Sequence, residues 1–119
     1  MPDVQANLSV RKQGNVSIVQ FQDRKILEEI TINQIGERLS ELADSESEPR
    51  LVLDFGAVEH LSSAALGMLI TLNRQVVDRQ GRLVLANIHP QIYEVFKITR
   101  LNKLFQIEAK VEDAVKALV

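Results

Sequence analysis

The chain of 119 residues is the size of one domain, and with 45% apolar residues it can bury a hydrophobic core without cross-links. The net charge of −2 argues against nucleic acid as the main partner, because phosphate binding favours a basic surface. Without cysteine, disulfides and thiolate metal sites are excluded. The sequence shows no signal peptide and no apolar run near the ~18 residues of a membrane span, so we expect a cytoplasmic protein without membrane insertion.

The charges are unevenly spread along the chain. Residues 23–48 hold eight acidic and three basic side chains, for a net charge of −5. Residues 74–103 hold six basic and two acidic side chains, for a net charge of +4. Ordinary solvated helix faces are the favoured interpretation of such a pattern, and steering of a charged protein partner is the alternative.

The first half of the chain predicts a hairpin, a helix and a buried strand. Short β-type runs at 8–11 and 16–21 flank the turn sequence QGN at 13–15, where Gly and Asn tolerate positive φ. Apolar residues spaced by three and four indicate a helix over 31–44. The continuous apolar run that opens 51–55 is typical of a central strand covered on both faces.

The second half alternates helices with strands. An amphipathic helix ends at Gln80-Gly81 in the manner of a glycine C-cap. Pro90 suits the first turn of a later helix. The elements expected after the central strand are a helix, a strand, a helix, a strand and a closing helix at 64–79, 82–87, 89–97, 104–107 and 111–118.

The expected order of elements is β-β-α-β-α-β-α-β-α. After the N-terminal β-hairpin, right-handed crossovers predict an α/β fold, with a mixed, mostly parallel β-sheet packed with about four α-helices. No internal repeat or linker divides the sequence, so we expect a single domain over 1–119.

Two serines, Ser62 and Ser63, open the helix that follows the central strand. A hydroxyl at the start of a helix lies beside free backbone N–H groups and the positive end of the helix dipole. One serine can simply cap the helix, which contributes ~1 kcal/mol. Alternatively, one is a phosphoacceptor, because the dipole tolerates the phosphate charge of roughly −1.5 to −2.

The helix after the serines is apolar on more than one side. The stripe expected to face the sheet holds Leu66, Leu69, Ile70, Asn73, Val76 and Val77. Met68 and Leu72 therefore point elsewhere. Either a neighbouring helix covers these two side chains, or they form an exposed apolar patch for a protein partner.

Catalytic and metal chemistry find little support in the sequence. Asp54, His60 and Ser63 are the residue types of a hydrolase triad, but no Gly-x-Ser-x-Gly elbow accompanies them. Asp54 at a strand end is better interpreted as a brace for the loop. His60 and His89 do not have metal-site spacing, and no Walker or dinucleotide motif is present. We therefore expect no enzyme, no metal site and no cofactor.

The stretch DFGAVEHLSSAALGMLITLNR resembles the signature of STAS domains, the anti-sigma factor antagonist family. That signature is an apolar strand ending in Asp, a short loop, and Asp-Ser-Ser/Thr-Gly-Leu-Gly opening a helix. The later GRLVLANIHPQIYEVFKITRLNKLF is similar to the family's second half. Aligned on the Leu-Gly pair at 66–67, Ser63 falls on the family's phosphoacceptor serine. Ser62 replaces the preceding Asp and becomes a second acceptor candidate, while Ala64 and Ala65 replace the usual Ser/Thr and Gly.

The resemblance implies a switch protein in signal transduction and transcription regulation. In this family the unphosphorylated domain binds an anti-sigma factor that is also a serine kinase. Phosphorylation of the serine, here Ser63, releases the domain, and a serine phosphatase resets it. Because the ends of parallel strands meet at one edge, we expect a loop near 23–25 to lie beside the serines. The expected partner contacts are His60, Ser62, Ala64, Ala65, Met68, Asp23 and Arg24.

A second hypothesis assumes the same fold but no regulation by phosphorylation. In it the protein is a constitutive STAS adaptor in a signalling or lipid-transport assembly, and Ser63 is only a helix cap. The replacements at Ser62 and Ala65 motivate this alternative, since they change the surroundings of the acceptor.

Overall fold

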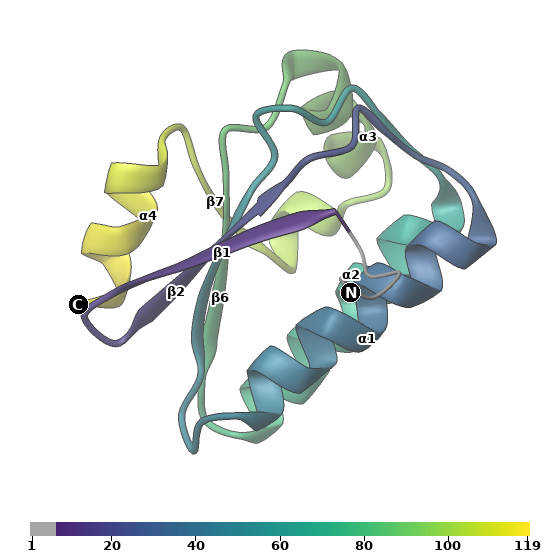
Figure 1. Cartoon of the computed structure of the whole chain (residues 1–119). Coiled ribbons are helices and arrows are strands. Elements are labelled where there is room, and N and C mark those ends of the chain that lie inside the picture. Colours follow the sequence, from purple (N-terminus) through teal and green to yellow (C-terminus); the bar gives the residue numbers. More distant parts are fainter. Residues whose placement is uncertain (1–6) are drawn as a thin grey trace.

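A five-stranded sheet with helices on both faces forms the body of the molecule (Figure 1). The computed structural model describes residues 7–119, so residues 1–6 of the expected domain lie outside the described part. The strand order is β1-β2-β4-β6-β7. These strands are β1 (Leu8–Gln13), β2 (Val16–Phe21), β4 (Arg50–Asp54), β6 (Arg82–Ala86) and β7 (Gln106–Glu108).

The sheet is mixed and mostly parallel, as predicted. Strands β1 and β2 form the antiparallel N-terminal hairpin, and Gly14 in its turn has a φ of 62°. The other neighbours pair in parallel, β2 with β4, β4 with β6 and β6 with β7. Because β2, β4, β6 and β7 follow one another in one direction across the sheet, crossovers of the same hand place α1, α2 and α3 on one face, and the helix after β7 lies on the other.

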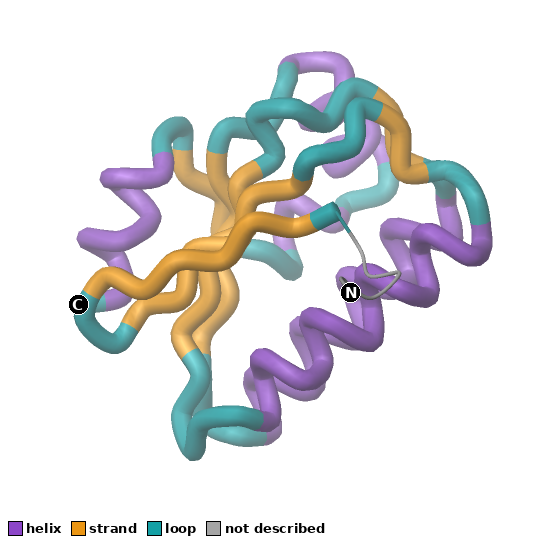
Figure 2. The backbone as a smooth tube through the Cα atoms, in the orientation of Figure 1, coloured by secondary structure: helices purple, strands orange, loops and turns teal. Residues whose placement is uncertain are grey.

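Helices α1 and α2 lie side by side along one face of the sheet, and α4 covers the other face (Figures 1 and 2). The prediction of about four helices in an α/β fold is confirmed. A short 3₁₀ helix, η1 (Leu101–Lys103), precedes β7. The helices are α1 (Glu29–Asp44), α2 (Ser63–Asp78), α3 (Pro90–Ile98) and α4 (Val111–Leu118).

Alternate residues of the central strands enter two separate cores. Leu51 and Leu53 of β4 belong to the larger core, beneath α1, α2 and α3. Val52 points the other way, into a smaller core that Ala114 and Val115 of α4 close. Burial on both faces explains the uninterrupted apolar run in this part of the sequence.

A small second sheet, which the sequence analysis did not predict, lies beside the start of α2. Strand β3 (Lys25–Ile26) pairs in parallel with β5 (His60–Leu61). The loop expected near 23–25 therefore ends at Lys25, the first residue of β3. A strand of two residues is too short to show the alternation that identifies strands in a sequence.

Two details of the second half differ from the predictions. Residues 104–107 do not form a strand throughout, because η1 extends the preceding connection and β7 begins only at Gln106. The left-handed backbone at Arg100, with a φ of 63°, separates α3 from η1. Phe105 is buried edge-on against Phe96, with ring centroids 5.9 Å apart, and this contact anchors the segment.

The end of α2 is a Schellman motif, but its left-handed residue is Gln80 instead of the expected glycine. The N–H of Gln80 donates to the Val77 carbonyl and the N–H of Gly81 to the Val76 carbonyl, both at 2.8 Å. Gly81 is needed for a different reason. A Cβ at this position would lie 2.1 Å from the carbonyl oxygen of Pro49, which precedes β4.

Candidate functional site

The two serines at the start of α2 have different structural roles. Ser62 is the N-cap, with extended backbone, and its hydroxyl oxygen accepts a hydrogen bond from the N–H of Ala65 at 3.1 Å. Ser63 is the first residue of the helix and is exposed. Within residues 7–119 no hydrogen bond involves the Ser63 hydroxyl. The hypothesis that Ser63 is only a helix cap is therefore wrong, because Ser62 is the cap.

Backbone hydrogen bonds hold the serine loop, residues 59–62, against the segment that leads into α1. The N–H of Ser62 donates to the carbonyl of Ile26 at 3.2 Å. The N–H groups of Glu59 and His60 both donate to the carbonyl of Arg24, at 2.7 and 3.1 Å. The 23–25 segment thus lies beside the serine loop, at the edge where we expected it.

The predicted contact residues of this segment already have partners within the chain. The Arg24 guanidinium lies 3.0 Å from the Glu59 carboxylate. The hydrogen bond and positive charge of Arg24 lower the pKa of the Glu59 carboxyl, and Glu59 raises the pKa of Arg24 in return. Asp23 accepts a hydrogen bond from the Asn7 amide at 3.1 Å. Both side chains help to position the loop.

Asp54 braces the loop after β4. Its carboxylate is buried and accepts hydrogen bonds from the N–H of Gly56 at 2.9 Å and the amide of Asn87 at 3.1 Å. The His89 Nε2 lies 2.7 Å from the Gly56 carbonyl oxygen. Sequence reasoning missed Asn87, although its left-handed φ of 60° is one that Asn tolerates. These bonds give Asp54 a structural role and leave it no place in a hydrolase triad.

Burial divides the other predicted partner contacts. His60 and Ala64 are exposed, and Ser62 and Met68 are half-buried. Ala65, in contrast, is fully buried, so the prediction that it contacts a partner is wrong. It begins the inward stripe of α2, which continues at the helical spacing through Leu69, Leu72 and Val76.

The stripe assigned to α2 from the sequence was also rotated. Leu72, which we had considered for an exposed patch, is 3% exposed, because α1 covers it. Val77, which we had placed on the inward stripe, is 56% exposed. Because nearly every residue from 64 to 72 is apolar, the sequence does not show which side of this helix faces the sheet.

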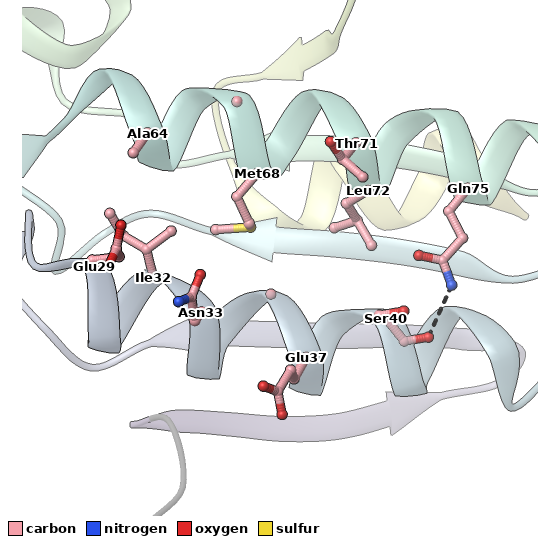
Figure 3. Close-up of a pocket in the computed structure, with 12 residues that line it drawn as sticks. Glu29, Ile32, Asn33, Glu37, Ser40, Ala64, Met68, Thr71, Leu72 and Gln75 are labelled. Carbon is pink, nitrogen blue, oxygen red and sulfur yellow. Dashed lines mark hydrogen bonds between the residues drawn. The ribbon is translucent and has the colours of Figure 1, made fainter.

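A groove of about 480 Å³ runs between α1 and α2, and its α2 wall begins directly after Ser63 (Figure 3). Met68 points from α2 toward α1, and the Gln75 amide bridges the helices by donating to the Ser40 carbonyl at 3.1 Å. Sequence reasoning missed the α1 wall, because one helix pattern does not show which residues of a second helix face it. The lining residues are Glu29, Ile32, Asn33, Gly36, Glu37, Ser40, Ala64, Gly67, Met68, Thr71, Leu72 and Gln75.

Residues 7–119 hold no group of three His, Cys, Asp or Glu side chains placed to ligate a metal ion. Among the helices of this part, none combines the length and apolar character needed to cross a membrane.

Comparison with known families identifies the class of protein that this fold and site define. Residues 7–114 match the model of the STAS domain, and the chain therefore belongs to the STAS domain family. Among individual relatives it is similar to BtrV of Bordetella bronchiseptica, which is provisionally named an anti-sigma factor antagonist. The two are 35% identical over 72 residues, which cover 60% of this chain and 62% of BtrV.

Solved structures share the fold over nearly the whole chain. An anti-sigma-factor antagonist (STAS) domain protein of Planctomyces limnophilus superposes with a TM-score of 0.85 at 18% identity, covering 98% of this chain and 100% of that one. An anti-sigma factor antagonist of Mycobacterium paratuberculosis gives a TM-score of 0.78 at 25% identity, covering 93% and 92%.

Proposed function

We propose that this STAS domain is a phospho-regulated binding protein of the anti-sigma factor antagonist type, with Ser63 as the phosphoacceptor. Unphosphorylated, it binds an anti-sigma factor that is also a serine kinase. Phosphorylation of Ser63 releases it, and a serine phosphatase restores the binding form. It acts in the cytoplasm by partner switching and catalyses no reaction itself. The names of BtrV and of the Mycobacterium paratuberculosis protein support this class of function.

The separation of roles between Ser62 and Ser63 carries the proposal. Ser62 uses its hydroxyl to cap the helix, whereas the exposed Ser63 hydroxyl is not needed for the fold. A phosphate on Ser63 would lie at the N-terminus of a 16-residue helix, where the dipole and free N–H groups favour an anion. Modification of Ser63 would therefore leave the domain folded and change only its surface.

Release follows from the cost of burying the new charge. The neutral Ser63 hydroxyl, beside the exposed Ala64 and half-buried Met68, can be covered by a partner at little cost. A phosphate carries a charge of roughly −1.5 to −2 and must lose its hydration in the same interface. Glu29 at the start of α1 adds like charge to this edge. For a near-complete switch, the binding free energies of the unphosphorylated and phosphorylated forms for the partner must differ by ~5.5 kcal/mol.

Site-mapped mass spectrometry on protein from its own cells tests the acceptor. We expect phosphate on Ser63, at levels that change between growing and stressed cultures. Phosphate confined to Ser62 would contradict the assignment. Absence of phosphate in every condition would favour the constitutive adaptor, with partner contacts around Met68.

Quantitative affinity purification of the full chain tests the release. We expect Ser63→Asp to lose the kinase partner that wild type retains, while its circular dichroism stays that of wild type. Ser63→Asn is the matched control, since it places a side chain of nearly the same shape at this position without adding charge, and it should retain the partner. Equal recovery of the kinase by Ser63→Asp and wild type would refute release by phosphorylation.

A further inference from the structure

We propose that the groove between α1 and α2 is a docking site for a basic amphipathic helix of a protein partner. This surface adjoins the Ser63 hydroxyl at Ala64, and its use as a docking site does not require phosphorylation. The groove runs from Ala64 to Gln75, which at 1.5 Å per residue is roughly 16 Å, or about three helical turns. Two parallel helices form its walls, a surface into which the apolar face of a third helix fits.

Gly67 is the first observation that points to a ligand. It lies inside α2, where glycine destabilises a helix relative to alanine, and its φ is not in the left-handed region. A Cβ built on Gly67 would meet no atom of the described chain within 4 Å. Neither backbone conformation nor internal packing therefore requires glycine here, and the open space is available to a partner.

Gly36, on the opposite wall, is in contrast required by packing within the chain. A Cβ on Gly36 would lie 3.1 Å from the Met68 Cγ, so this glycine lets the two helices approach. The two glycines of the groove therefore differ in whether internal packing requires them. The contact between α1 and α2 accounts for Gly36, whereas Gly67 leaves the α2 wall of the groove open to a partner.

The charges of the groove specify the chemistry of the partner. Its floor is apolar, formed by Ile32, Met68 and Leu72. Glu29 and Glu37 lie on the α1 side, and of the described residues that line the groove none is a lysine or arginine. An apolar floor beside two carboxylates fits a helix with an apolar stripe flanked by Lys or Arg, because each carboxylate then gains an opposite charge.

Site-specific photo-cross-linking with the full chain in its own cells tests the proposal. A photoreactive residue replaces Thr71, in the groove, or Val77, which is exposed elsewhere on α2 and serves as the control. We expect at least tenfold more product from Thr71, joined to a peptide with net positive charge and apolar residues at helical spacing. Product no more abundant than at Val77, or an acidic or neutral cross-linked peptide, would overturn the proposal.

Two groove variants show whether the cross-link depends on the features that carry the argument. Combined Glu29→Gln and Glu37→Gln should reduce the Thr71 product at least tenfold. Gly67→Ala should reduce it by a similar factor while raising the melting temperature, so that lost binding cannot be attributed to lost folding. Unchanged cross-linking in either variant would overturn the proposal.

Ser63→Asp distinguishes this docking site from the proposed switch. We expect it to leave the Thr71 cross-link at or above the wild-type level, because added negative charge does not repel a basic helix. Loss of the cross-link in Ser63→Asp would contradict independence of the two sites. Failure to find phosphate on Ser63 would refute the switch and leave the result in the groove intact.

Discussion

The two faces of the sheet differ in how completely their residues are explained by packing. On the α4 face, a short helix closes a small core of aliphatic side chains, among them Ile18, Val52 and Leu118. On the α1–α2 face, a larger core lies beneath two 16-residue helices that also carry an exposed hydroxyl and an open glycine. Neither the Ser63 hydroxyl nor the open space at Gly67 is used for packing or hydrogen bonding within residues 7–119, so both are available to a partner.

The largest expected effect compares neighbouring residues of β4 that enter opposite cores. Leu53 and Val52 are both fully buried. We expect Leu53→Ala to lower the free energy of unfolding by about 3–5 kcal/mol, and Val52→Ala by ~2 kcal/mol, because the second removes fewer carbons and leaves a smaller cavity. Urea denaturation measures both. An equal or larger loss for Val52→Ala would show that the α4 core is the more important one.

The next effect separates the two serines. Ser62→Ala removes the hydroxyl that accepts from the Ala65 N–H, so we expect a loss of ~1 kcal/mol in the free energy of unfolding. Ser63→Ala removes no hydrogen bond found in residues 7–119, and we expect a change within about 0.5 kcal/mol. Thermal denaturation of both variants provides the check. A larger loss for Ser63→Ala would reverse the roles assigned to them.

A gain in stability should follow from Gly67→Ala. Alanine is the better helix former and its methyl group meets open space, so we expect unfolding to become harder by about 0.5–1 kcal/mol. Gly36→Ala is the matched control in α1, where Met68 must shift to admit the methyl group, and no gain is expected. Destabilisation by Gly67→Ala, measured in urea, would mean that an internal constraint requires the glycine after all.

The smallest effect concerns the exposed pair of Arg24 and Glu59. Because Arg24 lowers the pKa of Glu59, the pair contributes to stability above the unfolded-state pKa of Glu, and this contribution is lost as pH falls through the folded-state pKa. Arg24→Gln should raise the pKa of Glu59 toward its ordinary value. An NMR titration of the Glu59 carboxyl carbon measures the change. An unchanged pKa would show that the contact does not persist in solution.

Sequence reasoning succeeded where a pattern extends over several turns or strands. Spacing of apolar residues located α1 and α2, and the uninterrupted run at 51–53 indicated a strand covered on both sides. It failed where the signal was short or uniform. Strands β3 and β5 have only two residues each, and the almost wholly apolar start of α2 concealed which side faces inward.

The candidate site was predictable in part. The motif and the position of Ser63 came from a resemblance between sequences, whereas the division of roles with Ser62 required backbone geometry to reveal the cap. The α1 wall of the groove depends on how two helices align. Only the fold shows that Gly36 lies against Met68 and that Gln75 reaches Ser40.

The small β3–β5 sheet has a consequence for how this edge of the domain opens. The amides of Glu59, His60 and Ser62 all donate to carbonyls of Arg24 or Ile26. A sheet of two-residue strands cannot separate one bond at a time, so a single local unfolding event should expose these three amides together. In hydrogen exchange these amides would then share one opening free energy, below that of the central strands. The serine loop and the segment that leads into α1 would open as a single cooperative unit.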